Sequence, residues 1–130
     1  MKNDISAIGN ALVDTVFKVE HSFIQELGLE IDQMTLSSAE EHAPIIERLI
    51  ASGAETVSDC GGSATNSLVA ASNFGAKCFH TCKVSDDQDG VKYLESLKKA
   101  GVGHKGNMAS AETTTTGKCL ILVTPDAKRT

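Results

Sequence analysis

Two strand patterns of hydrophobic residues open the chain. The apolar run 5–8 ends at a glycine, which predicts a buried N-terminal strand followed by a turn. Hydrophobic positions then alternate from Val13 to Val19, which predicts a second strand over 12–19. Asp14 falls on the opposite face of this strand, where a mid-strand acid needs either solvent or a polar partner. A solvated face is the commoner of the two cases.

Helical patterns and further strands follow. The other strands are predicted over 33–36, 55–60, 77–84 and 113–124. The helices are predicted from a capping box at Ser22 to Gly28, from a capping box at Ser38 to Gly53, from Ser63 to Asn73, and from the Ser85-Asp86-Asp87 cap to Gly101. Pro44 conflicts with one continuous helix from Ser38, because an interior proline loses a hydrogen bond, so the start of that helix stays open. The segment 101–111 shows little pattern.

The second half of the chain has a regular order of elements. Its two helices carry apolar stripes at helical spacing, Ala64, Leu68, Ala71 and Phe74 in the first and Val91, Leu94, Leu97 and Ala100 in the second. Strand, helix, strand and helix in succession form a βαβ arrangement. This order predicts the α/β class, with a mainly parallel sheet and right-handed crossovers.

A glycine pair joins the strand at 55–60 to the helix that follows it. Gly61 and Gly62 lack Cβ atoms and allow positive φ, so the backbone here can lie close to a ligand. The helix start presents free N–H groups, and Ser63 and Asn66 add polar side chains on the first turn. A plain tight turn before an N-capped helix explains the same residues equally well.

Composition narrows the classes of partner. The 130 residues fit one domain, and the formal net charge of −5, with scattered Lys and Arg, gives no footprint for nucleic acid or an anionic membrane. Neither a signal peptide nor a membrane-spanning run is visible. We therefore expect a cytoplasmic protein whose partner is a small molecule or another protein.

The four cysteines suit reduced thiols packed as small apolar groups, because there is no CxxC spacing and no secretory signal. Cys78, His80 and Cys82 share one face of a predicted strand. At ~3.3 Å per residue, however, the two sulfurs start about 13 Å apart, too far for one zinc ion. No metal site is predicted.

Four motifs together resemble the N-terminal portion of the PfkB, or ribokinase-like, family of carbohydrate and nucleoside kinases. They are Gly9-Asn10-Ala11-Leu12-Val13-Asp14, Gly61-Gly62-Ser63-Ala64-Thr65-Asn66, Val84-Ser85-Asp86-Asp87 with Gly90, and Thr116-Gly117-Lys118-Cys119 with Asp126-Ala127-Lys128-Arg129-Thr130. The resemblance covers nearly the whole chain. The first two motifs are most similar to the adenosine kinase-like branch.

The resemblance implies a ribokinase-like three-layer α/β fold with a small β-strand lid, of which 1–130 is the N-terminal, substrate-binding part. Lid strands are expected at about 12–19, 33–36, 55–60 and 113–124. Members of the family transfer the γ-phosphoryl group of ATP, with magnesium, to a hydroxymethyl group of a sugar or nucleoside such as adenosine. Lid strands in the family can pair between subunits, so the resemblance also allows a homodimer through these strands.

The resemblance also assigns residues to the substrate site. Asp14 is expected to accept hydrogen bonds from a pair of sugar hydroxyls, for which two carboxylate oxygens are suited. The other expected contacts are Asn10 and Asn66 to the polyol, Gly61, Gly62 and Ser63 at the backbone approach to the ribose, and Met34 and Cys119 at the apolar wall.

The catalytic part of the family is not found in this sequence. Its general base lies in a Gly-Ala-Gly-Asp motif, which does not occur in these 130 residues, and its ATP site belongs to the same C-terminal region. The chain also ends directly after an apolar strand with little to cover it. We therefore expect a fragment that does not catalyse transfer by itself, since phosphoryl transfer depends on positioning and charge stabilisation.

Two other functions describe part of the pattern. A glycine turn between strand and helix also occurs in NAD-binding oxidoreductases, but the three-glycine G-x-G-x-x-G spacing is lacking here. The third hypothesis, after the kinase and the oxidoreductase, is a non-enzymatic module that binds a nucleoside without catalysing a reaction.

Overall fold

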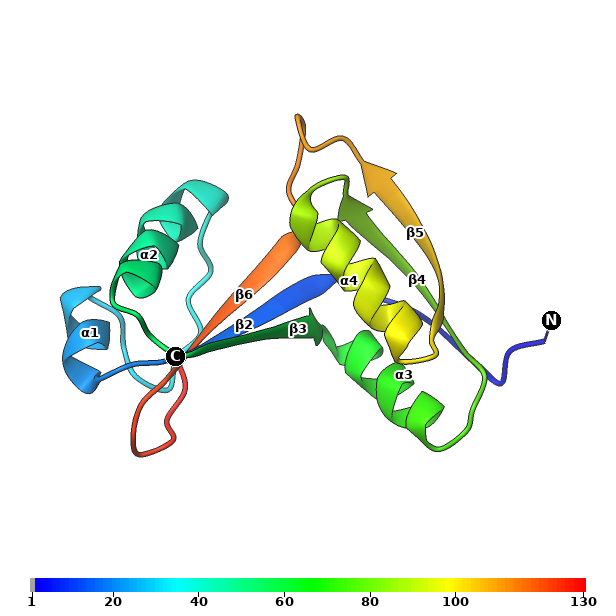
Figure 1. Cartoon of the computed structure of the whole chain (residues 1–130), viewed down its shortest axis with the longest axis horizontal. Helices are drawn as coiled ribbons and strands as arrows, with labels where there is room; N and C mark the ends of the chain where they lie inside the picture. The colour runs from blue at the N-terminus through cyan, green and yellow to red at the C-terminus, as the bar shows by residue number, and fades with distance from the viewer. Residues whose placement is uncertain (1) are drawn as a thin grey trace. The chain divides into compact units, whose positions relative to one another are not determined.

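The computed structural model describes residues 2–130, with the backbone alone at Gly106 and Asn107. The described elements are β1 (Ile5–Ile8), β2 (Leu12–Lys18), α1 (His21–Glu26), α2 (Ala39–Ala51), β3 (Thr56–Gly61), α3 (Ser63–Asn73), β4 (Cys78–Ser85), α4 (Gln88–Lys99), β5 (Gly103–Ala109) and β6 (Gly117–Val123) (Figure 1). They belong to two compact units. Unit 1 comprises Met1–Asp14 and Asp59–Cys119, and unit 2 comprises Thr15–Ser58 and Leu120–Thr130.

Unit 1 contains a parallel sheet with the strand order β1-β4-β5. Ile5 lies opposite Cys78 at the start of the first pair, and Phe79 lies opposite Gly103 at the start of the second. The parallel direction confirms the α/β prediction. The strand β5 was not predicted, because its polar, glycine-containing sequence lacks the alternation that marks a half-buried strand.

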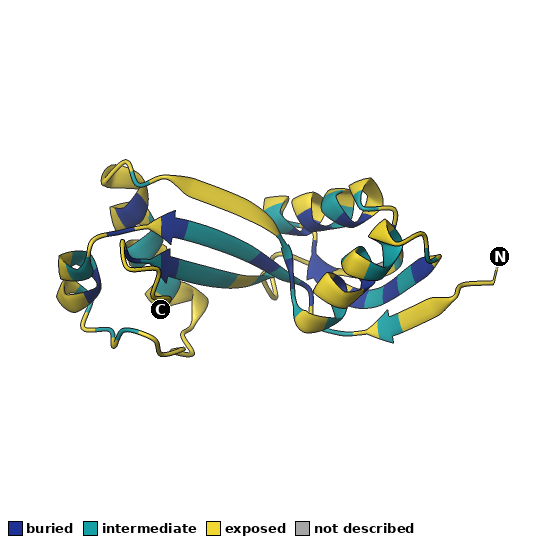
Figure 2. Cartoon of the chain, turned by 90° about the horizontal axis from the view of Figure 1, so that it is seen from below, coloured by how far each residue is buried: buried dark blue, intermediate teal, exposed yellow. Residues whose placement is uncertain are grey.

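Helices α3 and α4 pack on this sheet, α3 against β1 and β4, and α4 against β4 and β5 (Figure 1). Their buried faces differ from the predicted stripes. Phe74 is 92% exposed and Val91 is 46% exposed, whereas Thr65 and Tyr93 are fully buried beside Leu68 and Leu97. Figure 2 shows buried as well as exposed positions on these helices.

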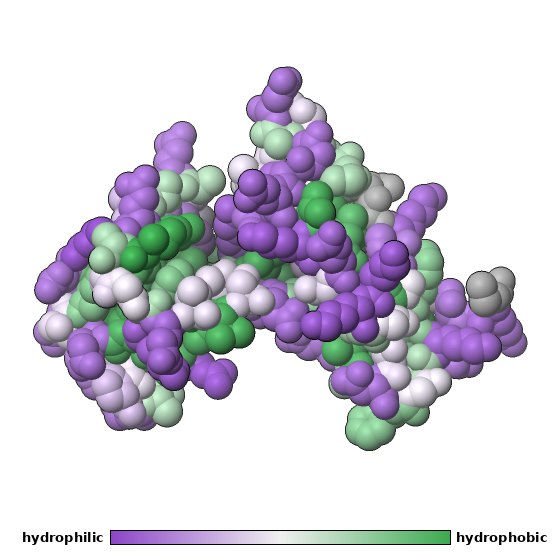
Figure 3. All heavy atoms as spheres, in the orientation of Figure 1, coloured by the Kyte–Doolittle hydropathy of each residue, from purple (hydrophilic) through white to green (hydrophobic). Residues whose placement is uncertain are grey.

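The N-terminal strand is less buried than its apolar sequence predicts. Ile8 is 86% exposed and Ile5 is 42% exposed. Strand β1 lies at the edge of the described sheet, next to β4 alone, so no second strand covers its outer side. Figure 3 shows hydrophobic residues that reach the surface among hydrophilic ones.

The start of α4 confirms the capping prediction for Asp87. This N-cap residue accepts a hydrogen bond from the Gly90 N–H at 2.7 Å and further bonds from the backbone and hydroxyl of Thr116. Asp86 has a different role, since its carboxylate accepts from the Ala111 N–H. One acid therefore caps the helix while its neighbour holds the loop after β5.

Unit 2 gathers α1 and α2 around a second apolar core that contains Phe17, Ile24, Leu49 and Leu122. The capping box at Ser38 is confirmed: its hydroxyl accepts from the Glu41 N–H, and the Glu41 carboxylate accepts from the Ser38 N–H. Helix α2 is continuous through Pro44, so it starts at Ala39, directly after the Ser38 cap. The predicted box at Ser22 is wrong, because α1 begins at His21 with Glu20 as an uncapped N-cap.

One predicted strand and one predicted strand boundary also need correction. Residues 33–36 form no strand in the described structure, and Leu36 is 87% exposed, so hydrophobic alternation there had no sheet to cover. The strand predicted over 113–124 begins only at Gly117, because a turn held by the Ser110 carbonyl occupies the residues before it. Beyond β6 the predicted turn at Pro125 is present, and Thr130 exchanges two backbone hydrogen bonds with Leu122.

Within the described part of the chain, no helix is long and apolar enough to cross a membrane.

Candidate functional site

The candidate site lies in unit 1, where β3 ends at Gly61 and α3 begins at Ser63. Gly62 is the N-cap of α3, with φ +100° and ψ 142°, and it gives the helix no side-chain cap. A residue with a side chain adopts that φ only under strain, so glycine is required here. The first turn of α3 therefore presents its N–H groups, with their partial positive charge, without a side-chain partner at the cap.

The segment between β1 and β2 packs against this elbow backbone to backbone. A Cβ atom at Gly62 would lie 2.7 Å from the Asn10 carbonyl oxygen, and a Cβ atom at Gly9 would lie 2.6 Å from the Ala64 Cβ. Both distances are too short for real contacts. The glycines thus allow two segments more than fifty residues apart in sequence to meet.

Asp14 completes this arrangement from β2. A Cβ atom at Gly61 would overlap the Asp14 carboxylate. The carboxylate can occupy this position only because residue 61 has no side chain. Asp14 is half-buried, and no hydrogen bond described for residues 2–130 ends on its carboxylate. Its two oxygens are therefore available to accept hydrogen bonds from a ligand.

Burial raises the pKa of Asp14 above its usual value, and the negative charge of Asp59 adds to this effect. The same kind of environment raises the pKa of the Cys119 thiol, through burial first and the Asp14 charge second. Burial together with the Asp59 charge raises the pKa of Cys60 to about 11. These thiols stay protonated at neutral pH, so they offer apolar surface rather than nucleophiles.

Seven of the eight predicted site residues belong to unit 1, namely Asn10, Asp14, Gly61, Gly62, Ser63, Asn66 and Cys119. The glycine contacts and the effect of the Asp14 charge on Cys119 place them around the elbow. Asn10, Ser63 and Asn66 are exposed. Met34 belongs to unit 2, where its side chain is 84% exposed.

The described residues include no cluster of three His, Cys, Asp or Glu side chains that suits a metal ion. Cys78, His80 and Cys82 are all buried on β4. The His80 ring instead approaches the hydroxyl of Thr65.

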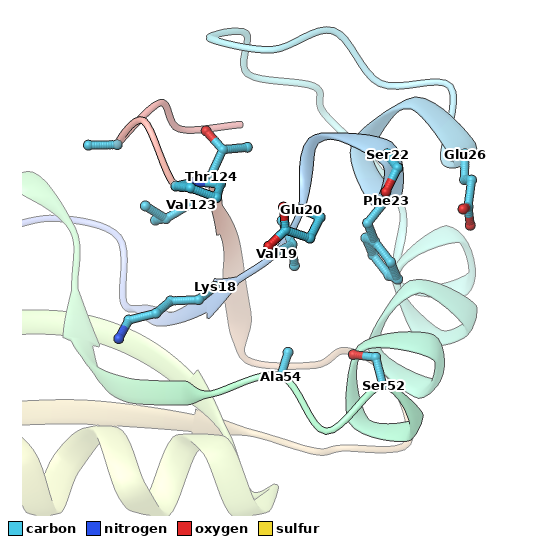
Figure 4. Close-up of a pocket in the computed structure, with 12 residues that line it drawn as sticks. Lys18, Val19, Glu20, Ser22, Phe23, Glu26, Ser52, Ala54, Val123 and Thr124 are labelled. Atoms are coloured by element: carbon cyan, nitrogen blue, oxygen red, sulfur yellow. The ribbon is translucent and has the colours of Figure 1, made fainter.

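A separate hollow of about 700 Å³ lies in unit 2 (Figure 4). Val19, Phe23 and Val123 contribute apolar surface to it, and Lys18, Glu20 and Glu26 contribute charge. None of the predicted site residues lines it. We place the candidate site at the elbow, because the elbow combines close backbone approach, an available carboxylate and an uncapped helix start.

Several residues near the elbow were not predicted. The negative charge of Asp59 adds to burial in raising the pKa of Asp14. Thr65, His80 and Tyr93 form a buried polar group beneath the first turn of α3. Of these residues, only His80 was considered as a candidate from the sequence, because it shares a strand face with Cys78 and Cys82. Thr65 and Tyr93 are polar residues on the buried faces of their helices, but the predicted apolar stripes did not include them.

The parallel α/β sheet and the glycine elbow define the class: a ribokinase-like fold. The chain belongs to the pfkB family of carbohydrate kinases, whose family model matches residues 28–130. This membership confirms the resemblance that the motifs indicated. No curated protein matches the sequence closely enough to count as a relative.

Solved structures agree with the family. A probable sugar kinase from Rhizobium etli superposes with a TM-score of 0.83 at 26% identity, over 98% of this chain and 37% of that chain. Adenosine kinases from Anopheles gambiae and Sinorhizobium meliloti follow with TM-scores of 0.79 and 0.76, at 25% and 28% identity, over 95% and 99% of this chain and 38% of each of those chains. The chain thus spans little more than a third of the length of these kinases.

Proposed function

We propose that this chain is the acceptor-binding part of an ATP-dependent sugar or nucleoside kinase, and that the Gly61-Gly62 elbow together with Asp14 forms the acceptor site. The observation that carries the proposal is the contact between Gly61 and the Asp14 carboxylate, which keeps two acceptor oxygens beside an uncapped helix start. A pair of neighbouring hydroxyls on a sugar ring matches two carboxylate oxygens.

The other polar contacts follow from the same geometry. Asn10 and Asn66 are the amide side chains at the elbow, and both are exposed. Each amide can donate and accept, as binding of a polyol requires. Cys119 offers apolar surface, and the Asp14 charge contributes to the raised pKa of its thiol after burial. Met34 remains a proposed wall residue.

The chemistry of the parent enzyme is phosphoryl transfer from ATP, with magnesium, to a hydroxymethyl group. Residues 1–130 contain no Gly-Ala-Gly-Asp motif. The role we propose for this chain is therefore binding and orientation of the acceptor, and the chain alone is expected to be inactive. The strands β2, β3 and β6 are its proposed lid strands.

Ligand binding by the 130-residue chain tests the proposal. Adenosine, inosine, ribose, fructose and NAD are titrated by calorimetry, and thermal unfolding is followed in parallel, because a ligand of the folded state raises its apparent stability. We expect one of the nucleosides or sugars to bind. Binding of NAD alone would contradict the kinase assignment, and binding of a nucleoside by a full-length parent that transfers no phosphate would favour the non-catalytic module.

A further inference from the structure

Three polar side chains from three different elements are buried together in the core of unit 1. Thr65 of α3 and His80 of β4 are 0% exposed, and Tyr93 of α4 is 1% exposed. Their neighbours in the core include Leu68, Cys82 and Leu97. Polar groups in such surroundings cost free energy unless they are hydrogen-bonded to one another.

The three side chains form a continuous hydrogen-bonded chain. The Tyr93 hydroxyl lies 2.6 Å from Thr65 Oγ1, and Thr65 Oγ1 lies 3.2 Å from His80 Nε2. His80 Nδ1 lies 3.4 Å from the carbonyl oxygen of Ala7 on β1. The chain thus connects α4, α3, β4 and β1.

The chemistry of the two ends fixes the direction of every bond. A carbonyl oxygen only accepts, so His80 Nδ1 carries the ring proton that faces Ala7. In a ring with one proton, Nε2 then accepts, and the Thr65 hydroxyl donates to it. Thr65 Oγ1 in turn accepts from Tyr93. Burial raises the pKa of Tyr93 to about 12, so its hydroxyl keeps the proton that this bond requires.

Two members of this network, Thr65 and Ala7, belong to the elements on either side of the elbow site. Thr65 lies in the first turn of α3, between Ser63 and Asn66, in a helix whose N-cap provides no side-chain bond. Ala7 lies on β1, which leads into Gly9 and Asn10. Thr65 and Ala7 are therefore attached to the two sides of the Gly62 contact with the Asn10 carbonyl.

Stability alone does not account for a polar chain in this position. Replacing all partners of a buried network by apolar groups of similar shape is often neutral for stability. A directional network instead specifies one arrangement of the elements that it joins, because each donor has a single acceptor.

We propose that His80 and Tyr93 are positioning residues for the ligand site: acting through Thr65, they fix the first turn of α3 against the 9–10 segment. This inference rests on the proposed function, because the ligand is the sugar or nucleoside proposed above. Neither residue is assigned a contact with that ligand.

The test compares Thr65→Val, which removes the hydroxyl and keeps the shape, with Thr65→Ser, which restores it, and with Tyr93→Phe. Leu97→Val is the matched control, since it weakens the core one turn further along α4 without touching the network. Adenosine or fructose affinity is measured by calorimetry, well below each melting temperature. We expect Thr65→Val and Tyr93→Phe to raise Kd about tenfold, as loss of one hydrogen bond suggests, and Thr65→Ser and Leu97→Val to leave it unchanged.

A second readout does not depend on ligand binding. Imidazole ¹⁵N shifts should show the proton of His80 on Nδ1 in the wild type and in Thr65→Ser. Amide hydrogen exchange at Ser63, Ala64 and Asn66 should be faster in Tyr93→Phe than in Leu97→Val. Equal exchange in those two variants, or a proton on Nε2, would overturn the inference. If no ligand of the panel binds the wild type, the proposed function fails, and exchange and tautomer still decide the network.

Discussion

A methyl group at Gly61 would occupy the place of the Asp14 carboxylate. The smallest residue on β3 thus determines where the acid on β2 can lie. This relationship turns an unfavourable mid-strand acid into a half-buried acceptor beside the elbow. Predictions about the site follow from it and from the neighbouring contact at Gly62.

The two positive-φ glycines on either side of α3 form a matched pair. Gly62 has φ +100° and a Cβ site 2.7 Å from the Asn10 carbonyl, whereas Gly75 has φ +91° and an open Cβ site. Gly75→Ala should lower the free energy of unfolding by about 1–2 kcal/mol from backbone strain alone. Gly62→Ala should cost about 1–3 kcal/mol more, because the backbone segments must separate. Denaturant titration measures both, and equal costs would refute the close contact.

Asp14→Asn separates binding from stability. The folded-state pKa of Asp14 is raised above 3.8, so its contribution to stability falls as pH rises through the interval between 3.8 and that raised value. Removing the charge should therefore leave the melting temperature at neutral pH unchanged or higher. Affinity for the acceptor should fall about tenfold, since a charged acceptor is lost. Asp59→Asn is the control, with a smaller effect on affinity; equal affinities of Asp14→Asn and wild type would remove Asp14 from the site.

Asp87→Ala should destabilise unit 1. The substitution removes the cap of α4 and leaves Thr116, which is 2% exposed, without its carboxylate partner. Loss of a cap costs about 1 kcal/mol, and a buried hydroxyl proton and backbone N–H without an acceptor cost about 1–3 kcal/mol, so the free energy of unfolding should fall by about 2–4 kcal/mol. Asp86→Ala, which leaves the cap intact, should cost less.

The pH dependence of the same residue gives an independent prediction. Although burial opposes the charged form of Asp87, hydrogen bonds from Thr116 and Gly90 hold its pKa below 3.8. Its stabilisation is therefore present above 3.8 and is lost as pH falls through the lower folded-state value. Melting curves recorded across that range should show a shallower acid decline for Asp87→Asn than for wild type. Parallel curves would contradict the assignment.

The capping box of α2 provides a test in unit 2. Ser38→Ala removes the hydroxyl that accepts from Glu41 and should lower the free energy of unfolding by about 1 kcal/mol. Ser37→Ala, one residue earlier and exposed, should leave it unchanged. Equal values for the two variants in chemical denaturation would show that the box does not stabilise the helix.

Local sequence determined much of this fold. An apolar run located β1, alternation located β2, and capping residues located the start of α4, whereas Pro44 left the start of α2 open. Gly28, Gly53 and Gly101, all with positive φ, end the helical segments that were predicted to stop there. These features depend on neighbours within a few residues, so they can be read directly from the chain. The family motifs likewise indicated the correct fold and the residues of the proposed site.

Tertiary packing decided the rest. Strand β5 has no apolar alternation and exists because β4 supplies a paired neighbour, and the segment 33–36 has the alternation but no such neighbour. Thr65 and Tyr93 can be buried because Tyr93 bonds to Thr65 and Thr65 bonds to His80, across three elements. The approach of Gly61 to Asp14 depends on how closely strands β3 and β2 lie together. The sequence determined which residues were suited to the elbow, and only long-range contacts decided how they meet, because those contacts join residues dozens of positions apart.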